Sequence, residues 1–479
     1  MITSRDSFFI GNEWVKPSTS RTFTLVNAST EEEIGTVPEA VEADIDAAVA
    51  AARDAFDNSG WATAEPAERA AVMERFMAAV AARGADLAEA VSVQNGMPIA
   101  LSSQLEGQFG VGVIQYYAEL AKTIGQPDVR PSQMGKETLV RRAPVGVAAA
   151  IVPWNFPVTL ALNKIAPAMA AGCTVVIKPS PGTVLDSYIL AEAALEAGVP
   201  AGVLNWVTAE REAGAYLVSH PGVDKVAFTG STAAGRKIAA ACGELLRPVT
   251  LELGGKSAAI LLEDVDIGSF LQGVPMACML NNGQTCYNGT RVLAPKKRYD
   301  EVVGALADFA KSLNVGNALD PETHVGPMAS SAHRDRVQSY IEIGKDEARL
   351  VAGGGRPADQ NSGFFIEPTV FADVDNSARI AQEEIFGPVL SVIPYDGESE
   401  AVRIANDSEY GLGGSVWSAD SEHAKSIADK VDSGTVGVNG YMPSLGAPFG
   451  GVKASGIGRE FGPEAVGAYQ KLKSIYVMG

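Results

Sequence analysis

The chain contains few cysteines and few histidines, with four of each among 479 residues. Cys173, Cys242, Cys278 and Cys286 are too few and too scattered for a disulfide framework, and no CxxC pair or zinc-like Cys/His spacing occurs. We therefore expect reduced thiols and no bound metal.

Long apolar runs and basic clusters are missing too. The first thirty residues lack the basic start and apolar stretch of a signal peptide, and no segment reaches the ~20 apolar residues that span a membrane. We accordingly expect a cytoplasmic protein. The formal net charge is -19, and the densest basic run, PKKRYDE at 295–301, ends in acids. Such an acidic field repels nucleic acid and anionic membranes, so neither is an expected partner.

The order of apolar patterns predicts an α/β protein with more than one domain, because a chain of this length exceeds the size at which one hydrophobic core stops growing. Residues 41–94 place apolar side chains at helical spacing, whereas from about residue 139 short apolar runs alternate with helical stretches. That alternation predicts a parallel sheet covered by helices on both faces. Its candidate strands are VGVAAAIVPW, CTVVIKPS, VDKVAFTG and PVTLELGG.

After about residue 298, helical patterns and short apolar runs alternate again, but less regularly. Helical patterns at 298–313 and 332–347 precede the apolar segments FFIEPTVF and PVLSVIPY, which predicts a second α/β domain. Residues 126–142 carry Pro, Gly and polar residues with an extended tail, which is typical of an arm or hairpin rather than core.

Four polar segments follow the predicted strands of the first sheet: PWNFP at 153–157, KPSP at 178–181, TGSTAAG at 229–235 and ELGGK at 252–256. Open parallel sheets bind ligands in the crevice outside the carboxyl ends of their strands. We therefore expect these four segments to form one site.

Each segment also has a less specific interpretation. TGSTAAG suits a phosphate at a helix N-terminus, but it does not match GxGxxG and an ordinary Gly/Ser turn explains it equally well. Lys178 suits a nucleotide phosphate or ribose, although a solvated surface lysine is more common. Glu252 is either a general base or an exposed strand glutamate, and Asn155 either stabilises an oxyanion or forms a turn.

Cys286 lies in the polar run LNNGQTCYNGTR at 280–291, whereas a core cysteine normally has aliphatic neighbours. A papain-like enzyme would need a histidine, but His220, His324, His333 and His423 fall in segments typical of surface loops or helix starts. A helix N-terminus or a cofactor charge also favours a thiolate, so a nucleophilic role needs no histidine. Cys173 and Cys242 suit the core, and Cys278 suits a helix face.

Seven motifs in order resemble those of the aldehyde dehydrogenase superfamily across nearly the whole chain: PWNFP, KPSP, FTGSTAAG, LELGGK, GQTC, EEIFGPV at 383–389 and PFGGVKASGIGRE at 448–460. None is decisive alone, but their order and family-like spacing, including the separation of Glu252 from Cys286, are highly specific.

The resemblance implies NAD(P)-dependent oxidation of an aldehyde to a carboxylate by an enzyme of the hydrolytic type. Cys286 would form a thiohemiacetal and then a thioester, the Asn155 amide and the Cys286 backbone N–H would hold the oxyanion, Glu252 would activate water, and Lys164 would help relay protons. The implied cofactor positions are Trp154, Lys178, Ser180, Gly230, Ser231, Gly254, Glu384 and Phe386, and the implied substrate positions are Phe156, Leu160, Asn163, Thr285 and Tyr287.

The implied fold has a Rossmann-like NAD(P)-binding domain (1–123 and 144–254), a catalytic α/β domain (255–447) and a small oligomerisation arm (124–143 and 465–479) that gives homodimers or homotetramers. NAD is slightly favoured over NADP. Two positions depart from the family pattern: Pro181 replaces a glutamate that many NAD-preferring members place against the adenosine ribose, and Asn163 replaces a frequent Trp.

Two alternatives stay open. A coenzyme A-acylating relative would pass the thioester to a thiol, although the presence of Glu252 argues against it. A non-catalytic binding protein on the same scaffold would bind cofactor without turnover.

Overall fold

Five parallel strands form the centre of the first large sheet. The computed structural model describes residues 4–125 and 127–478; residues 1–3, 126 and 479, which the predicted domain ranges include, lie outside the described residues. The parallel strands are, in order, β9 (Leu204–Trp206), β8 (Thr174–Lys178), β7 (Val147–Ile151), β10 (Lys225–Thr229) and β11 (Val249–Glu252). The strand order reverses between β7 and β10, and at such a switch point ligands bind beside the carboxyl ends.

Short antiparallel strands complete the edges of this sheet. β1 (Phe8–Ile10) and β2 (Glu13–Val15) lie at one edge, and β21 (Gly456–Ile457) pairs with β11 at the other. A separate hairpin is formed by β3 (Thr22–Val26) and β4 (Glu33–Pro38). The strands before residue 40 were not predicted; β1 and β2 have only three residues each, which is too few positions to show an alternating pattern.

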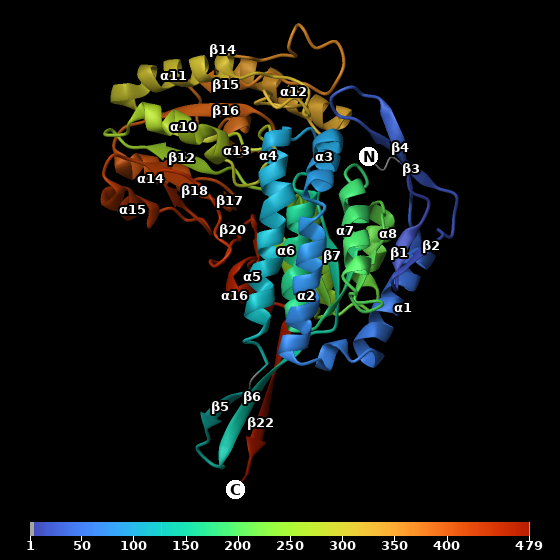
Figure 1. Cartoon of the computed structure of the whole chain (residues 1–479). Helices are drawn as coiled ribbons and strands as arrows, with labels where there is room; N and C mark the ends of the chain where they lie inside the picture. The colour runs from blue at the N-terminus through green and yellow to red at the C-terminus, as the bar shows by residue number, and fades with distance from the viewer. Residues whose placement is uncertain (1–3, 126, 479) are drawn as a thin grey trace.

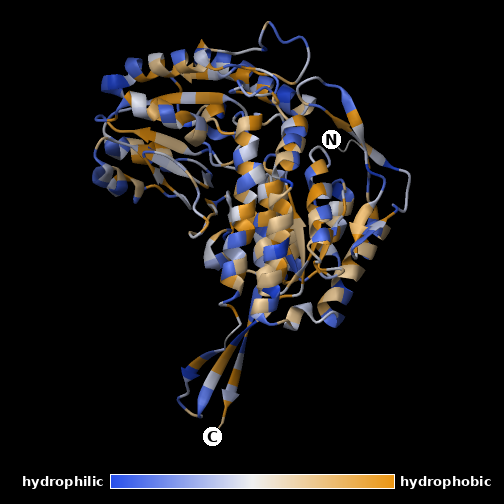
Figure 2. Ribbon diagram, in the orientation of Figure 1, coloured by the Kyte–Doolittle hydropathy of each residue, from blue (hydrophilic) through white to orange (hydrophobic). Residues whose placement is uncertain are grey.

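Alternation along β7 explains why both faces of the sheet are covered. Ala148 and Ala150 pack into one hydrophobic cluster, while Val147, Ala149 and Ile151 pack into a second cluster on the opposite face. Apolar residues gather in these strands and in the helices around them (Figure 2). The helices are α1 (Glu42–Asn58), α2 (Pro66–Ala81), α3 (Gly84–Asn95), α4 (Ile99–Gln104), α5 (Gly110–Ala121), α6 (Pro157–Ala171), α7 (Leu185–Glu196), α8 (Arg211–Ser219) and α9 (Thr232–Glu244), with short turns η1 (Trp61–Thr63) and η2 (Leu105–Phe109).

The second large sheet confirms the prediction of a second α/β domain. Its order is β14 (Arg349–Ala352), β15 (Thr369–Ala372), β16 (Val389–Tyr395), β13 (Arg291–Pro295), β12 (Ala258–Leu261), β18 (Gly414–Trp417) and β19 (Gly437–Val438), and every pair except β14–β15 is parallel. The accompanying helices are α10 (Ile267–Ala277), α11 (Tyr299–Ser312), α12 (Ser331–Glu347), α13 (Arg379–Gln382), α14 (Glu398–Asn406) and α15 (Ser421–Ala428), with the turn η3 (Lys296–Arg298).

The predicted helices at 298–313 and 332–347 are confirmed as α11 and α12. The predicted strand FFIEPTVF is only half right, because β15 begins at Thr369. Before it, Pro368 has no N–H to donate, and the backbone N–H groups of Phe364 and Glu367 bond to loops at Ala28 and Gly355 instead of to a strand.

The third sheet projects from the body as an arm (Figure 1). β5 (Asp128–Pro131) and β6 (Glu137–Pro144) form the predicted hairpin, and β22 (Gln470–Val477) pairs with β6 along its whole length. The parallel-sheet cofactor domain, second α/β domain and small arm of the predicted fold class are therefore all present. Their boundaries stay a prediction, which leaves 448–464 unassigned. This segment contains β20 (Val452–Lys453), which pairs with β17 (Tyr410–Gly411), and the beginning of α16 (Gly462–Gly467). Across residues 4–125 and 127–478, no helix combines the length and the apolar character needed to cross a membrane.

Candidate functional site

The strand register places the four polar segments at one edge of the first sheet. Ile151 pairs with Lys178 on one side and with Phe228 on the other, and Thr229 pairs with Glu252. PWNFP, KPSP, TGSTAAG and ELGGK therefore leave neighbouring strands at the same level, as the sequence predicts. The short segment 253–257 then joins β11 to β12, so this edge also borders the second domain.

The Cys286 loop lies between α10 and β13 and contacts that connecting segment. Cys286 is half-buried, whereas the other three cysteines are fully buried. Cys278 follows the last residue of α10 instead of lying on a helix face. A Cβ atom at Gly255 would lie 2.3 Å from the carbonyl oxygen of Cys286, so only glycine permits this approach. The thiol is thus held where the two large sheets meet.

The surroundings of Cys286 disfavour the thiolate. Burial raises the pKa of the Cys286 thiol above its usual range, and the carboxylates of Glu384 and Glu252 raise that pKa further. The backbone N–H groups of Cys286 and Tyr287 act in the opposite direction. In the protein by itself, the thiol is therefore protonated at neutral pH.

Asn155 directs its side chain toward the Cys286 loop. Its amide nitrogen donates a hydrogen bond of 2.9 Å to the backbone carbonyl of Gln284, which leaves one N–H free for another acceptor. The residue is 4% exposed, and its bond partner belongs to a different loop. The alternative interpretation, in which Asn155 only shapes its own turn, is therefore wrong.

Glu252 is buried at 3% exposure, so its interpretation as an exposed strand glutamate is wrong. Leu251 and Leu253 pack together into the hydrophobic cluster on the other face, as alternation predicts. Within the described residues, neither carboxylate oxygen of Glu252 has a hydrogen-bond partner. Burial raises its pKa well above the usual range, and the charge of Glu460 adds to this effect, while Lys164 opposes it.

Lys164 and Glu460 form a buried ion pair behind Glu252. The Lys164 amine donates to Glu460 over 2.7 Å and to the hydroxyl of Thr229 over 2.6 Å. Their side chains are 0% and 6% exposed. Sequence analysis missed the part played by Glu460, although this residue ends the motif PFGGVKASGIGRE. The pair places a charged donor and acceptor next to the glutamate at the strand end.

Glu384 reaches across from the second domain to the ELGGK segment. One oxygen accepts a hydrogen bond of 2.9 Å from the backbone N–H of Gly255, and a Cβ at Gly254 would lie 2.6 Å from the other oxygen. Burial raises the pKa of Glu384 to about 7. A half-buried carboxylate is therefore fixed on two glycines beside the Cys286 loop.

Trp154 and Phe386 lie edge to face with ring centroids 5.4 Å apart, and His333 completes this aromatic group at 4.9 Å from Trp154. Phe386 has a left-handed backbone with φ 67°, and the His333 Nε2 lies 2.7 Å from its carbonyl oxygen. Burial lowers the pKa of His333 to about 4, so the neutral ring donates this hydrogen bond. His333 lies in the first turn of α12, which confirms its predicted place at a helix start, and its half-buried ring packs against Trp154 and Phe386.

Lys178 is also buried, at 8% exposure, which contradicts its interpretation as a solvated lysine. Its amine makes one long hydrogen bond of 3.3 Å, to the carbonyl of Pro179. Burial lowers its pKa to about 8, and the nearby carboxylate of Glu210 opposes this shift. Half-buried Ser180 follows it at the sheet edge.

Gly230 and Ser231 lead from β10 into α9. The Gly230 N–H donates to the carbonyl of Glu252 over 3.0 Å, and exposed Ser231 caps the helix through the N–H of Ala234. These contacts fit both the phosphate-binding and the ordinary-turn interpretation.

A series of aromatic side chains includes Tyr287, the residue that follows Cys286. Ring centroids of neighbouring pairs lie 4.6–6.2 Å apart in the series Tyr441, Tyr287, Phe449, Phe461 and Phe109. Phe449 and Phe461 belong to one hydrophobic cluster. The half-buried residues that pack against this cluster include Phe156, Leu160, Tyr287 and Cys286. Of these rings, sequence analysis named Phe156 and Tyr287 and missed the others, whose positions in the chain are far from both.

Two of the predicted substrate positions are buried, whereas Phe156, Leu160 and Tyr287 are half-buried. Thr285 is buried, and its hydroxyl donates to the carbonyl of Leu280 over 2.9 Å. Asn163 is 3% exposed, and its carbonyl oxygen has no hydrogen-bond partner among the described residues.

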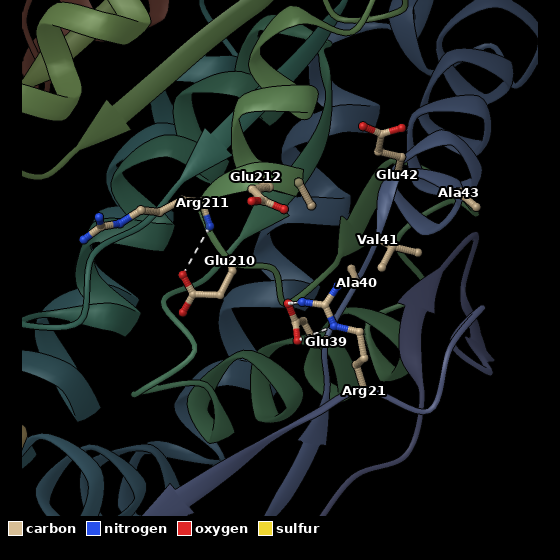
Figure 3. A pocket seen from close by; sticks show the side chains of 10 residues that line it. Arg21, Glu39, Ala40, Val41, Glu42, Ala43, Glu210, Arg211 and Glu212 are labelled. Carbon is tan, nitrogen blue, oxygen red and sulfur yellow. Dashed lines mark hydrogen bonds and ion pairs between the residues drawn. The ribbon is translucent and has the colours of Figure 1, made fainter.

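A separate surface cavity of about 660 Å³ lies at the beginnings of α1 and α8 (Figure 3). It is lined by glutamates and by Arg21 and Arg211, and Arg21 is bonded to Glu39. The lining contains neither a cysteine nor an aromatic ring, so this cavity does not share the chemistry of the Cys286 site.

Comparison with known proteins agrees with this geometry. A profile of the Aldehyde dehydrogenase family matches residues 14–475. The chain is 60% identical to a protein of Castellaniella defragrans named geranial dehydrogenase, and the alignment covers 100% of both chains.

Solved structures are similar as well. The Mycobacterium tuberculosis aldehyde dehydrogenase complexed with NAD+ has 47% identity and a TM-score of 0.97, with 100% of this chain and 99% of that chain covered. The NAD+ complex of Bacillus cereus aldehyde dehydrogenase has 40% identity and a TM-score of 0.95, with 98% and 96% covered. This chain therefore belongs to the aldehyde dehydrogenase family.

Proposed function

We propose that this protein oxidises an apolar aldehyde to the carboxylate with a nicotinamide dinucleotide, through a thioester on Cys286. The observation that carries the proposal is the half-buried Cys286 thiol in a loop that also accepts a hydrogen bond from the Asn155 amide. The thiol, the amide and the buried Glu252 carboxylate supply the nucleophile, the oxyanion donor and the base that this chemistry requires.

In the first half-reaction, the Cys286 thiol loses its proton to solvent water as the sulfur forms a bond to the aldehyde carbon, and the carbonyl oxygen takes the negative charge. The second N–H of the Asn155 amide and the backbone N–H of Cys286 then hold that oxyanion. When bound, the nicotinamide supplies the acceptor for the hydride that leaves this carbon.

In the second half-reaction, Glu252 takes a proton from water, and the water oxygen replaces the Cys286 sulfur on the acyl carbon. The raised pKa of Glu252 suits this role, because a base with a pKa nearer the operating pH holds the proton it receives. Lys164 and Glu460 lie behind it and are proposed to pass that proton onward. The carboxylate product then leaves and the thiol is restored.

The residues at the sheet edge fit a nicotinamide dinucleotide. Gly254 leaves its surface open to Glu384, whose half-buried carboxylate suits the hydroxyls of the nicotinamide ribose, and Trp154 and Phe386 offer rings for the nicotinamide. Lys178 and Ser180 suit the adenosine side, and Gly230 and Ser231 at the start of α9 suit the phosphates.

NAD is proposed as the preferred form of the cofactor. Pro181 supplies no carboxylate at the position where many NAD-preferring members have one, but Glu210 acts on the Lys178 amine and brings a negative charge to the same region. A carboxylate there disfavours the 2′-phosphate of NADP. The two similar structures with bound NAD+ support the same choice.

The aromatic surroundings of Cys286 favour an apolar substrate chain, because aromatic and aliphatic side chains desolvate such a chain without leaving charges unpaired. The relative of 60% identity is named for geranial, an unsaturated apolar aldehyde. Phe156 and Leu160 contribute to the same wall, and Asn163, Thr285 and Tyr287 are proposed to border it.

A cytoplasmic location is part of the proposal, because all four cysteines are unpaired and Cys286 must stay reduced to act. Recovery of the protein from an oxidising compartment in cell fractionation would contradict that location.

The main test of the proposal follows absorbance of the reduced cofactor with the purified protein, NAD+ or NADP+, and a panel of geranial, hexanal, benzaldehyde and an aminoaldehyde. We expect reduction with the apolar aldehydes, faster with NAD+. The Cys286→Ala protein should bind cofactor and show no aldehyde-dependent reduction. Acyl-coenzyme A formation on addition of coenzyme A would favour the acylating alternative, and activity of the alanine variant would contradict the role of Cys286.

Replacing Glu252 with Gln should leave one rapid equivalent of reduced cofactor per site and lower steady turnover by about 10²-fold or more, because the thioester forms but water is not activated. Stopped-flow absorbance separates the two phases. The exposed Glu263, paired with Lys297, offers the control Glu263→Gln, which should behave as wild type. Loss of the initial burst in the Glu252 variant would contradict a role confined to hydrolysis.

The raised pKa of Cys286 predicts the pH dependence of its alkylation in the absence of cofactor. Because the thiolate fraction still grows above the usual cysteine pKa of about 8.5, the rate of reaction with iodoacetamide should rise continuously from about pH 6 to about pH 9. Mass spectrometry of the modified protein locates the label, and Cys286→Ala gives the background. A rate that begins to level off near the usual cysteine pKa of about 8.5 would show that the pKa is not raised.

The arm is proposed to join subunits into a homodimer or homotetramer, because it exposes the apolar side chains of Val129, Met134, Leu472 and Tyr476. Light scattering should give a multiple of the monomer mass. The double variant Leu472→Asp/Tyr476→Asp should lower that mass, whereas Leu319→Asp, an exposed apolar site outside the arm, should not. A monomeric wild-type protein would contradict this assignment.

A further inference from the structure

We propose that Asn95 is a positioning residue for the oxyanion donor, and that it acts by fixing the two peptide groups on either side of Asn155. This inference rests on the proposed role of the Asn155 amide. It adds a residue that lies outside all seven sequence motifs and that contacts neither the aldehyde nor the cofactor in the proposed mechanism.

The contacts of Asn95 are all with backbone. Its side-chain nitrogen donates to the carbonyl of Trp154 over 2.7 Å and to the carbonyl of Asn155 over 2.8 Å. Its side-chain oxygen accepts the N–H of Met97 over 3.1 Å. Asn95 is 0% exposed, so both amide hydrogens are committed to these carbonyls and no water competes for them.

The two carbonyls belong to the peptide groups that flank the Cα atom of Asn155. Fixing both peptide planes fixes the direction of the Cα–Cβ bond between them. This bond direction determines where the side-chain amide of Asn155 lies. At the other end, the amide is bonded to the carbonyl of Gln284. The donor is thus held from its backbone by Asn95 and from its tip by the Cys286 loop.

Asn95 is itself tied to the Cys286 loop. It is the last residue of α3, and Gly96 follows with φ 82°, where a Cβ would lie 2.3 Å from the carbonyl oxygen of Pro327. Asn282 donates to the carbonyls of both Gly96 and Pro327, over 2.8 and 3.0 Å. The end of α3 is therefore bonded both to the backbone around Asn155, through Asn95, and to the Cys286 loop, through Asn282.

Asn281 does not duplicate this function. Its amide donates to the carbonyl of Asn155 over 2.8 Å, but no bond from it to the carbonyl of Trp154 is present in the described chain. One bond restrains one peptide plane and leaves the other free to tilt. Loss of Asn95 therefore releases the peptide group before Asn155 even when Asn281 is intact.

The chain offers a matched control in Asn205 of β9. Asn205 is also 0% exposed, donates to two backbone carbonyls, those of Gly202 and Val175, and accepts the N–H of Gly11. β9 carries no residue of the proposed site. Loss of either asparagine removes the same number and kinds of hydrogen bond. A difference in burst rate between the two variants therefore reports on the place of Asn95 beside Asn155 and not on lost stability.

The test compares full-length Asn95→Ala and Asn205→Ala proteins with wild type, with NAD+ and hexanal as probes. Both variants should lower the melting temperature by similar amounts and bind NAD+ with wild-type affinity, measured by protein fluorescence. The burst rate of reduced cofactor should fall about 10- to 100-fold in Asn95→Ala, because a displacement of about 1 Å at a catalytic group has effects of this size. Asn205→Ala should keep the wild-type burst rate.

Equal burst rates in the two alanine variants, with a normal wild-type burst, would overturn the Asn95 proposal and leave the proposed function standing. Absence of a burst in wild type would overturn both. The pair Asn95→Ser and Asn205→Ser keeps the test decisive if an alanine variant does not fold, since a hydroxyl retains one donor. Asn95→Ser should then have a burst rate below that of Asn205→Ser, and equality would again refute the proposal.

Discussion

The close contact between the segment after β11 and the Cys286 loop is the constraint on which the rest of the site depends. Gly254 faces the Glu384 carboxylate, and Gly255 faces the carbonyl of Cys286 at a distance that no side chain permits. The segment is also a covalent link between the two large sheets. Since interiors are packed at near-crystalline density, an added methyl group at Gly255 must move the backbone of the Cys286 loop and not a single side chain. The position of the thiol relative to Glu252 therefore follows from the packing of two sheets.

Charge is distributed unusually around this contact. Glu252, Glu384 and Glu460 all lie close to the reacting sulfur or to one another, and the pKa values of Glu252, Glu384 and Cys286 are all raised. Lys164 opposes the shift of Glu252, and it is already paired with Glu460. The thiolate of Cys286 is thus disfavoured in the protein by itself, and the positive charge of an oxidised nicotinamide is the kind of partner that this region lacks.

The local pattern of the sequence predicts the strands, their order of appearance and the residues at their ends, because each of these depends on neighbours a few positions away. Alternation correctly separates Glu252 from Leu251 and Leu253. The same pattern cannot show that Glu252 and Lys178 are buried, since the groups that cover them come from other parts of the chain. Glu460 meets Lys164 across 296 positions, and His333 reaches Trp154 from the second domain. Such partners are set by tertiary packing, which single-sequence patterns do not encode.

The pairing of β22 with β6 has a consequence for how the protein is made. β22 ends at Val477, and its partner precedes β7, the central strand of the first sheet. The Lys164–Glu460 pair likewise joins an early segment to a late one. A chain that emerges from the ribosome from its N-terminus can build the first parallel strands, but it cannot close the arm before β22 is made or complete the buried ion pair before Glu460 is made. Until β22 is made, β6 presents an open sheet edge, which is a template for pairing with other chains.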